Sequence, residues 1–350
     1  MQYSPRLPAL VAAGLLLPFM TQAANYSARR TAVDGVEVIE LTDAAHHVSV
    51  SIAPSIGNMA YEIKVRGKNI LWFPYHSPAD LKAQPNLCCV PFLGPWANRL
   101  DEDGFWANGK RYKLNPELGN LRRDAHQKPI HGLLNFSPLW EVASVDADAH
   151  SAHATSKLEF WKHPDLMAQF PFAHTITMTY RLHNGEVEVE TTLDNHATDP
   201  MPVAVGYHPY FRLDDEPRDQ WKVHLPARDH LVLNNFLIPT GEKKPVEFAD
   251  PHALHVSQLD DVFGGLIHGK DGRAHFSVTG KKQKIAVIYG PKYTVAVVYA
   301  PAARDFICFE PMAAITNAFN LAHSGVYQEL QSVPAGGQWK ESFWIAASGF

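Results

Sequence analysis

The 350-residue sequence has little of what defines several common protein classes. It contains three cysteines, too few for a disulfide framework, and neither an HExxH motif nor a Cys/His spacing typical of a zinc site. No block of Lys or Arg indicates a nucleic-acid-binding face, and the formal net charge is -5. Helical periodicity is almost absent, which excludes TIM barrels and Rossmann folds, because both need strands alternating with long helices.

The longest apolar run stands at the N-terminus. Residues 7–20 follow an arginine and are apolar apart from two prolines. The run is too short and too interrupted for a comfortable membrane span. This pattern, with small residues after it, is typical of a secretory signal peptide. We therefore expect residues 1–23 to be cleaved after Ala23, with Ala24 the near alternative, and the protein to be periplasmic or secreted. The other interpretation is an N-terminal anchor that stays uncleaved.

The three cysteines lie in apolar runs. Cys88 and Cys89 are adjacent, and a disulfide between neighbours in the sequence is strained, so we do not expect one there. Cys308 is left with two alternatives, a disulfide with Cys88 or Cys89, or a buried thiol. We favour three buried thiols.

What the sequence does contain is short runs rich in Val, Ile, Thr and aromatic residues, the pattern of β-strands. Such runs cover residues 48–53, 60–65, 174–181, 186–193, 286–289 and 293–299. Turn signals with Gly, Asn or Asp separate them at residues 67–69, 108–110, 183–185 and 270–272.

Only two segments indicate helix, and each is long enough for one or two turns. They are residues 77–82 and 164–169. We find no internal repeat and no low-complexity linker. The sequence therefore predicts an all-β fold, with residues 24–350 forming a single domain, a large antiparallel β-sandwich.

One histidine stands inside an apolar and aromatic run, residues 203–211, that is typical of a buried strand. Burying the imidazole of His208 costs free energy unless its ring nitrogens are hydrogen-bonded. Histidine also exchanges protons readily near neutral pH. His208 is therefore either a core histidine bonded to a backbone carbonyl or a proton-transfer group.

One glutamate, Glu310, directly follows four apolar residues, 306–309. If its side chain points inward, burial raises its pKa towards that of a useful base. We expect Pro311 to end strand pairing there, so that the strand end opens onto a pocket. The alternative is a partly exposed glutamate at a strand terminus.

Three further segments place polar groups where a β core does not need them. Arg99 follows a turn shaped by glycine and proline, and its guanidinium can bind a ligand oxygen as a fork. His131 precedes a glycine, which lets backbone and ligand approach closely. Asp260 and Asp261 can bind sugar hydroxyls. The alternatives are that Arg99 is a surface or structural arginine, that His131 is an ordinary loop histidine, and that the two aspartates form a turn.

These segments occur in a fixed order along the chain. The order is Arg99 in ANRL, His131 in IHG, His208 in HPYF, the segment IPTGE, Asp260 in LDDVF and Glu310 in FEP. It resembles the aldose 1-epimerase (galactose mutarotase-like) superfamily, from about residue 48 to residue 344. The resemblance implies a β-sandwich of the supersandwich type, a sugar as substrate, and no metal or organic cofactor.

The resemblance also implies a role for each residue. Glu310 is the general base that takes the proton of the C1 hydroxyl, and His208 is the general acid that protonates the ring oxygen. Arg99, His131 and Asp260 bind the sugar oxygens, and Asp260 is preferred over its neighbour by its spacing in the family pattern. The ring opens, the C1–C2 bond rotates, and closure gives the other anomer.

One departure bears on the substrate. Tyr207 stands where many family members have Asn before the histidine, and this looks more like the branch that includes hexose-6-phosphate epimerases. An exported enzyme meets few sugar phosphates, so we expect a free aldohexose or the reducing end of a longer sugar.

Three alternative functions remain at this point. A hexose-6-phosphate 1-epimerase needs a further cation, for which Arg122 and Arg123 are the candidates in sequence. A non-catalytic carbohydrate-binding protein needs neither acid nor base. A glycan-cleaving enzyme would use Glu310 and Asp260 as two carboxylates. In each case the partner is a sugar, with no nucleic acid and no membrane after cleavage, and the protein is a monomer or homodimer.

Overall fold

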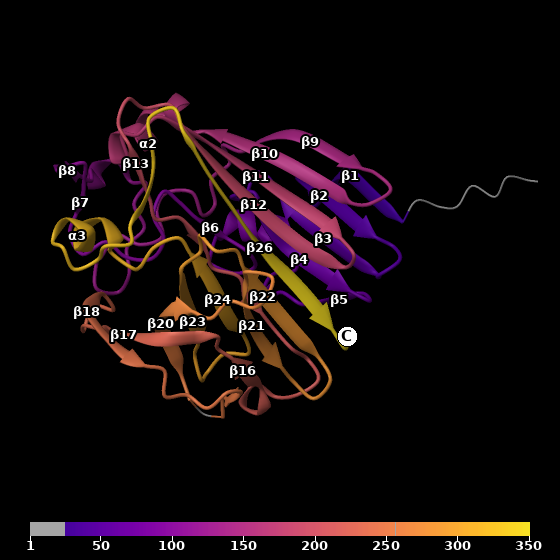
Figure 1. Ribbon diagram of the computed structural model, residues 1–350. Coiled ribbons are helices and arrows are strands. Elements are labelled where there is room, and N and C mark those ends of the chain that lie inside the picture. The colour runs from indigo at the N-terminus through magenta and orange to yellow at the C-terminus, as the bar shows by residue number, and fades with distance from the viewer. Residues whose placement is uncertain (1–24, 256) are drawn as a thin grey trace, which may run out of the picture.

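The computed structural model describes residues 25–255 and 257–350, which form mainly β-strands (Figure 1). The expected leader, residues 1–23, lies outside these described residues. In the described part of the chain the named strands pair antiparallel throughout, so the predicted all-β antiparallel fold is confirmed. No helix there is both long and apolar enough to cross a membrane.

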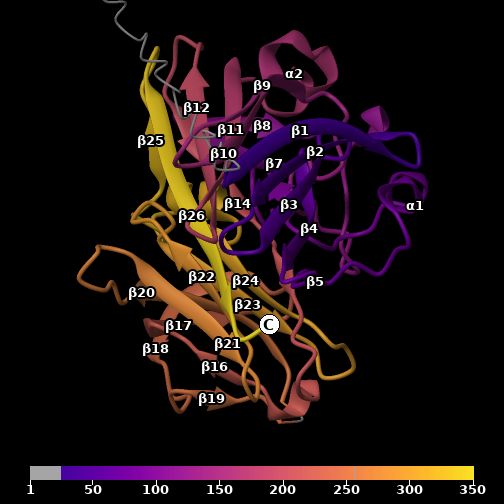
Figure 2. The same ribbon diagram turned by 90° about the vertical axis from the view of Figure 1, so that its right-hand side faces the viewer.

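The largest sheet has nine strands. Their order is β19 (His252–Ala253), β16 (Lys222–His224), β21 (Ala274–Thr279), β22 (Lys284–Tyr289), β26 (Gln338–Ser348), β12 (Glu186–Asn195), β11 (His174–His183), β10 (Ala152–Glu159) and β9 (Glu141–Ala147). Two smaller sheets pack against it, one on each half (Figures 1 and 2).

The smaller sheets have five and eight strands. The five-stranded order is β1 (Tyr26–Val33), β2 (Val36–Asp43), β3 (Val48–Ala53), β4 (Met59–Val65) and β5 (Lys68–Asn69). The eight-stranded order, with the off-path strand last, is β18 (Pro239–Pro245), β17 (Ala227–Leu233), β20 (Leu259–Leu266), β23 (Val295–Ala300), β24 (Ile307–Met312), β14 (Gly206–Tyr207) and β6 (Phe92–Leu93), with β15 (Tyr210–Phe211) pairing with β24.

Strand register places both smaller sheets on one face of the nine-stranded sheet. Tyr180 is opposite Val189, and Val189 is opposite Phe343, so these three side chains share a face. Tyr180 donates to the carbonyl of Asn58 in the loop before β4, whereas Phe343 packs on Tyr207 of β14, with ring centroids 4.7 Å apart. The inner face of the large sheet therefore forms one continuous core with both partners.

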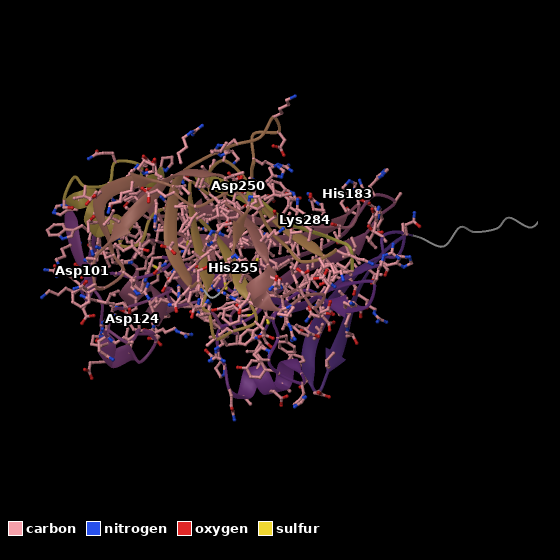
Figure 3. All side chains as sticks on the ribbon, turned by 90° about the horizontal axis from the view of Figure 1, so that it is seen from below. Asp101, Asp124, His183, Asp250, His255 and Lys284 are labelled. Atoms are coloured by element: carbon pink, nitrogen blue, oxygen red, sulfur yellow. The ribbon has the colours of Figure 1, made fainter. Side chains whose placement is uncertain are left out.

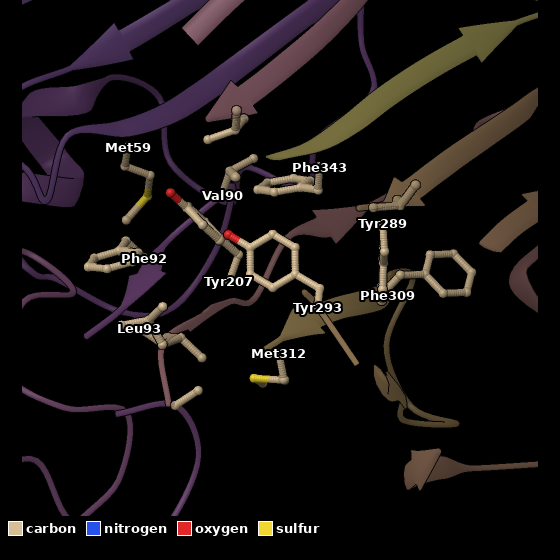
Figure 4. Close-up of a cluster of buried hydrophobic side chains, with 14 of the residues drawn as sticks. Met59, Val90, Phe92, Leu93, Tyr207, Tyr289, Tyr293, Phe309, Met312 and Phe343 are labelled. Atoms are coloured by element: carbon tan, nitrogen blue, oxygen red, sulfur yellow. The ribbon is translucent and has the colours of Figure 1, made fainter. Parts of the chain in front are cut away.

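Figure 4 shows the part of this core where the three sheets meet. Tyr207 is fully buried there, between Phe92 and Phe343, and its hydroxyl lies 2.6 Å from that of Thr191. Burial of each such aromatic side chain contributes roughly 2 kcal/mol. Tyr207 therefore belongs to the core, and its bearing on substrate choice stays a prediction.

The remaining elements are short. Two pairs of strands stand apart, β7 (Gly104–Ala107) with β8 (Lys110–Lys113) and β13 (Met201–Val203) with β25 (Gln331–Val333). The helices are α1 (Pro78–Ala83), α2 (Pro164–Gln169) and α3 (Ala318–His323), and single 3-10 turns cover Pro116–Leu118, Phe160–Lys162 and Arg218–Gln220. The two predicted helices are confirmed as α1 and α2, whereas α3 was not predicted.

The four predicted turns are confirmed, and the cysteines are reduced. Residues 108–109 join β7 to β8, residues 184–185 join β11 to β12, and residues 270–272 lie between β20 and β21. Arg66 and Gly67 join β4 to β5, so this turn begins one residue earlier than predicted, and Lys68–Asn69 forms the short edge strand after it. All three cysteines are buried free thiols, so the disulfide alternative for Cys308 is wrong.

Candidate active site

His208 lies in a break between two short strands, not inside one buried strand as predicted. β14 ends at Tyr207 and β15 begins at Tyr210, and both pair with β24. In the break, the backbone N–H of His208 donates to the carbonyl of Pro91 over 3.1 Å. Side chains alternate between the two faces of a strand, and this alternation directs Tyr207 into the core. Because the strand is interrupted after Tyr207, the His208 side chain does not follow that alternation.

Glu310 lies within β24, and the prediction that Pro311 ends strand pairing is wrong. Pro311 remains paired with Ala296 of β23, and the strand continues to Met312. On the other edge of β24 the neighbouring strand is interrupted between β14 and β15, so a residue without an N–H is tolerated there. The same interruption places His208 beside Glu310.

The two side chains face each other at 3.2 Å, measured from His208 Nε2 to Glu310 Oε1. Both are buried, with 6% and 1% of their surface exposed. Tyr210 stacks on the imidazole with ring centroids 4.6 Å apart and an interplanar angle of 4°, which fixes the plane of the ring. Glu310 Oε2 has no hydrogen-bond partner among the described residues and is available to a ligand.

All five predicted site residues line a single cavity of about 210 Å³. This equals the liquid volume of about seven water molecules, a space on the scale of one pyranose ring. The other lining residues are Leu87, Asn98, Ile130, Tyr210, Val297 and Tyr299. The aromatic walls are thus Tyr210 and Tyr299, and none of the aromatic residues near Arg99 in sequence contributes.

Arg99 is held by neighbours on one side and lines the cavity on the other. Its Nε donates to Asp124 Oδ2 over 2.6 Å and its Nη1 to Asn98 Oδ1 over 2.9 Å. Burial opposes ionisation of Asp124, but the Arg99 guanidinium and backbone N–H groups lower its pKa overall. Lys128 binds both Asp124, through its backbone N–H, and Asp101, and these two aspartates lie towards the same edge of the molecule (Figure 3).

His131 reaches the cavity through an unusual backbone conformation. Its φ is 62°, and the N–H donates to the carbonyl of Asn98 over 2.8 Å. The imidazole meets that of His208 edge-on, with ring centroids 5.5 Å apart. Burial lowers the pKa of His131 well below its usual value, and the charges of His208, Arg122 and Arg99 add to this, so His131 is neutral at pH 7.

Substitution of Gly132, which is next to His131, is expected to lower the free energy of unfolding measurably. Its φ is 66°, and a Cβ there would lie 2.2 Å from the carbonyl oxygen of Gly94. Gly132→Ala is therefore expected to lower the free energy of unfolding by about 2 kcal/mol or more. Gly119→Ala is the control, because Gly119 has a φ of 68° with no atom near its Cβ, so only about 1 kcal/mol is expected. Urea unfolding of both variants tests this, and equal losses would contradict it.

Asp260 and Asp261 point to opposite sides of β20. Consecutive residues of a strand alternate, and Asp260 lines the cavity while Asp261 Oδ1 lies 2.8 Å from Nε2 of His230. Burial raises the pKa of Asp260. Tyr299 is opposite Asp260 in the neighbouring strand, which is why both reach the same cavity.

The electrostatics of the His208–Glu310 pair favour the form with one shared proton. Burial raises the pKa of Glu310 well above its usual range, and the Asp260 carboxyl raises it further. Burial lowers the pKa of His208 to about 3, with Arg122 and Arg99 acting in the same direction. Burial favours two neutral groups, and the short distance favours carboxylate with imidazolium. Both forms hold one proton, so the pair titrates as a unit.

Sequence reasoning missed Asn98, Tyr210, Tyr299 and the positioning residue Asp124. Tyr210 had a signal, since it stands two residues after His208 in an alternating run. Tyr299 becomes visible only through its register with Asp260, and Asp124 only through its contact with Arg99. These are pairings between distant segments that composition and spacing do not reveal.

Comparison with known proteins gives sequence relatives over most of the chain. A family model described as aldose 1-epimerase matches residues 37–346. The uncharacterized protein YphB of Escherichia coli is 24% identical over 234 residues, which cover 64% of this chain and 72% of YphB. Human galactose mutarotase is 26% identical over 215 residues, which cover 58% of this chain and 55% of that protein.

Solved structures share the fold. A galactose mutarotase-like protein from Clostridium acetobutylicum superposes with a TM-score of 0.82 at 19% identity, over 93% of this chain and 99% of that one. A galactose 1-epimerase from Lactobacillus acidophilus gives a TM-score of 0.71 at 15% identity, with the same coverage. At these identities the likeness establishes the β-sandwich architecture of the galactose mutarotase type.

Proposed function

The chain belongs to the aldose 1-epimerase family, and from this premise we propose that it interconverts the α and β anomers of a free aldohexose or of a sugar reducing end. The observation that carries the proposal is the 3.2 Å contact of His208 with Glu310 on the wall of a small cavity. Anomer interconversion moves one proton off the C1 hydroxyl and one onto the ring oxygen, so it needs a base and an acid together.

The proposed steps follow from these two side chains. Glu310 accepts the proton of the C1 hydroxyl while His208 protonates the ring oxygen, and the bond between C1 and the ring oxygen breaks. The product is the open aldehyde, and rotation about C1–C2 exposes its other face. On closure His208 takes the proton back and Glu310 returns its proton to the new hydroxyl. Arg99, His131 and Asp260 bind sugar oxygens and hold the ring.

The shared proton predicts the pH dependence of the reaction. A second proton at low pH removes the base, and loss of the only proton at high pH removes the acid. Burial lowers the pKa of His208 to about 3, so activity should persist to a lower pH. Burial also raises the pKa of Glu310, so activity should persist to a higher pH. We therefore expect kcat/KM to show no decline as the pH falls through about 6.5.

The pH profile is measured from about pH 5 to about pH 9, with the spontaneous rate subtracted at each pH. A decline centred near the usual imidazole pKa would contradict the shared-proton interpretation, since it would indicate a solvated histidine acting alone. If kcat/KM declines at both low and high pH, the two apparent pKa values belong to the His208–Glu310 pair and not to either residue alone.

The direct test of the proposal follows the optical rotation of freshly dissolved α-glucose, α-galactose and other aldoses with the protein. Acceleration over buffer supports it, and none with any aldose overturns it. Calorimetric binding without acceleration favours the non-catalytic carbohydrate-binding alternative. Release of new reducing ends from a glycan favours the cleaving alternative.

The hexose-6-phosphate alternative depends on a cation beyond Arg99. Arg123 is engaged elsewhere, since its Nη1 donates to Asp103 over 2.8 Å and to the carbonyl of Gln127 over 2.6 Å. Arg122 alone remains for an anionic group. We propose a periplasmic or secreted location on the pattern of residues 1–23, and this location favours substrates without phosphate.

A further inference from the structure

A second hollow lies next to the catalytic cavity along residues 130–133, and an arginine lines it. The hollow has a volume of about 430 Å³ and is lined by Gly132 and Leu133, which directly follow the cavity residues Ile130 and His131. Arg122 also lines it, and its described lining contains no carboxylate. Arg122 is therefore a cationic side chain in a hollow that shares a backbone segment, residues 130–133, with the catalytic cavity.

Backbone pairing sets the direction of Arg122. Ile130 is bridged to Arg99 on one side, and on the other its N–H donates to the carbonyl of Arg122 over 3.0 Å. The neighbouring bridge from Arg123 to Pro129 puts Arg122 opposite Ile130 in register. Arg122 and Arg99 therefore lie on the two sides of Ile130, with Arg99 lining the catalytic cavity and Arg122 lining the adjoining hollow.

Arg122 has no counter-charge in the part of the chain that the structure describes. Burial lowers the pKa of its guanidinium, and the neighbour that opposes this is Tyr210, not a carboxylate. Arg99, by contrast, is neutralised by Asp124. A partly buried cation without a partner is unfavourable, and an anionic ligand group would compensate it. The charge of Arg122 also lowers the pKa of His131 and of His208, so Arg122 is close enough to influence groups that line the catalytic cavity.

We propose that Arg122 binds a carboxylate of the substrate, which makes hexuronic acids the preferred aldoses; this rests on the proposed function. One guanidinium matches one carboxylate in charge and in bidentate geometry. A phosphate dianion on Arg122 would leave one negative charge uncompensated, next to a catalytic cavity that is already lined by the carboxyl groups of Asp260 and Glu310. The single positive charge of Arg122 thus matches a carboxylate better than a phosphate.

Galacturonate and galactose test the proposal, because they differ only in a carboxylate in place of a hydroxymethyl group. We expect a kcat/KM at least about 10-fold higher for galacturonate, falling as salt is added. Arg122→Gln should remove this preference and lower kcat/KM for galacturonate by about 10- to 100-fold. Arg123→Gln is the matched control, since Arg123 is paired with Asp103, and it should retain the preference.

Binding of galacturonate, measured by calorimetry on folded wild type and Arg122→Gln, tests the site without relying on catalysis. We expect the variant to bind at least about 10-fold more weakly. Equal binding, or equal kcat/KM for the two sugars in the wild type, overturns the proposal. Preference for glucose 6-phosphate over glucuronate overturns the carboxylate assignment. Anomer interconversion of neutral sugars alone overturns this inference but supports the proposed function, whereas no interconversion of any sugar overturns the latter.

Discussion

Glu310→Gln is expected to lower kcat for anomer interconversion by about 1000-fold. The amide has the shape of the carboxyl group but cannot take the proton of the C1 hydroxyl. Because Glu310 is buried and its pKa is raised, a neutral side chain of the same size leaves the fold intact. KM should change little, since the lost interaction belongs to the transition state. Optical rotation with the spontaneous rate subtracted measures the effect.

Asp261→Asn is the control for loss of a carboxylate near the site. Asp261 lies beside Asp260 in sequence, but its side chain contacts His230 on the opposite side of β20. We expect kcat within about 2-fold of wild type, because the changed group does not line the cavity. Retention of more than about a tenth of kcat by Glu310→Gln would show that another group serves as the base.

The second large effect is expected for His208→Asn, with kcat lowered by about 100- to 1000-fold. Asparagine keeps a polar group near Glu310 but cannot deliver a proton to the ring oxygen. The pair works as a unit, so the double variant with Glu310→Gln should be only a few-fold slower than Glu310→Gln alone. Losses that multiply would contradict a shared proton.

His174→Asn separates a catalytic histidine from a core histidine. His174 is buried, its Nδ1 lies 2.7 Å from the carbonyl oxygen of Phe172, and its ring stacks on Phe160. These are the contacts that the core interpretation of His208 required, and His208 Nδ1 has no such partner among the described residues. We expect His174→Asn to lower the melting temperature and to leave kcat within about 2-fold.

Local patterns in the sequence were enough for the sheet architecture. The run at 48–53 coincides with β3, and the runs at 174–181 and 186–193 form the hairpin of β11 and β12, because alternation and an Asn-Gly turn are local signals. The run at 203–211 was wrongly predicted as one continuous strand, because its apolar composition gives no sign of the break at His208. That break depends on how β14 and β15 share the edge of β24, which is a tertiary property.

The order of motifs also identified five of the residues that line the cavity, but not what surrounds them. Arg99 could be predicted as a ligand-binding residue, whereas the neutralising contact with Asp124 joins segments 25 residues apart. Arg122 and Arg123 look equivalent in sequence. Only the structure separates Arg123, which is paired with Asp103, from Arg122, which has no counter-charge among the described residues. Charge compensation depends on distances, which spacing along the chain does not fix.

The His208–Glu310 pair is expected to interconvert sugar anomers, and exchange spectroscopy by NMR measures this reaction itself. At anomeric equilibrium, cross-peaks between the α and β anomeric protons report the exchange rate without any coupled assay. For galacturonate or a neutral aldohexose, wild-type protein should produce these cross-peaks and Glu310→Gln should not. Absence of exchange with wild type, while the sugar resonances broaden through binding, would contradict the account and make the protein a carbohydrate binder.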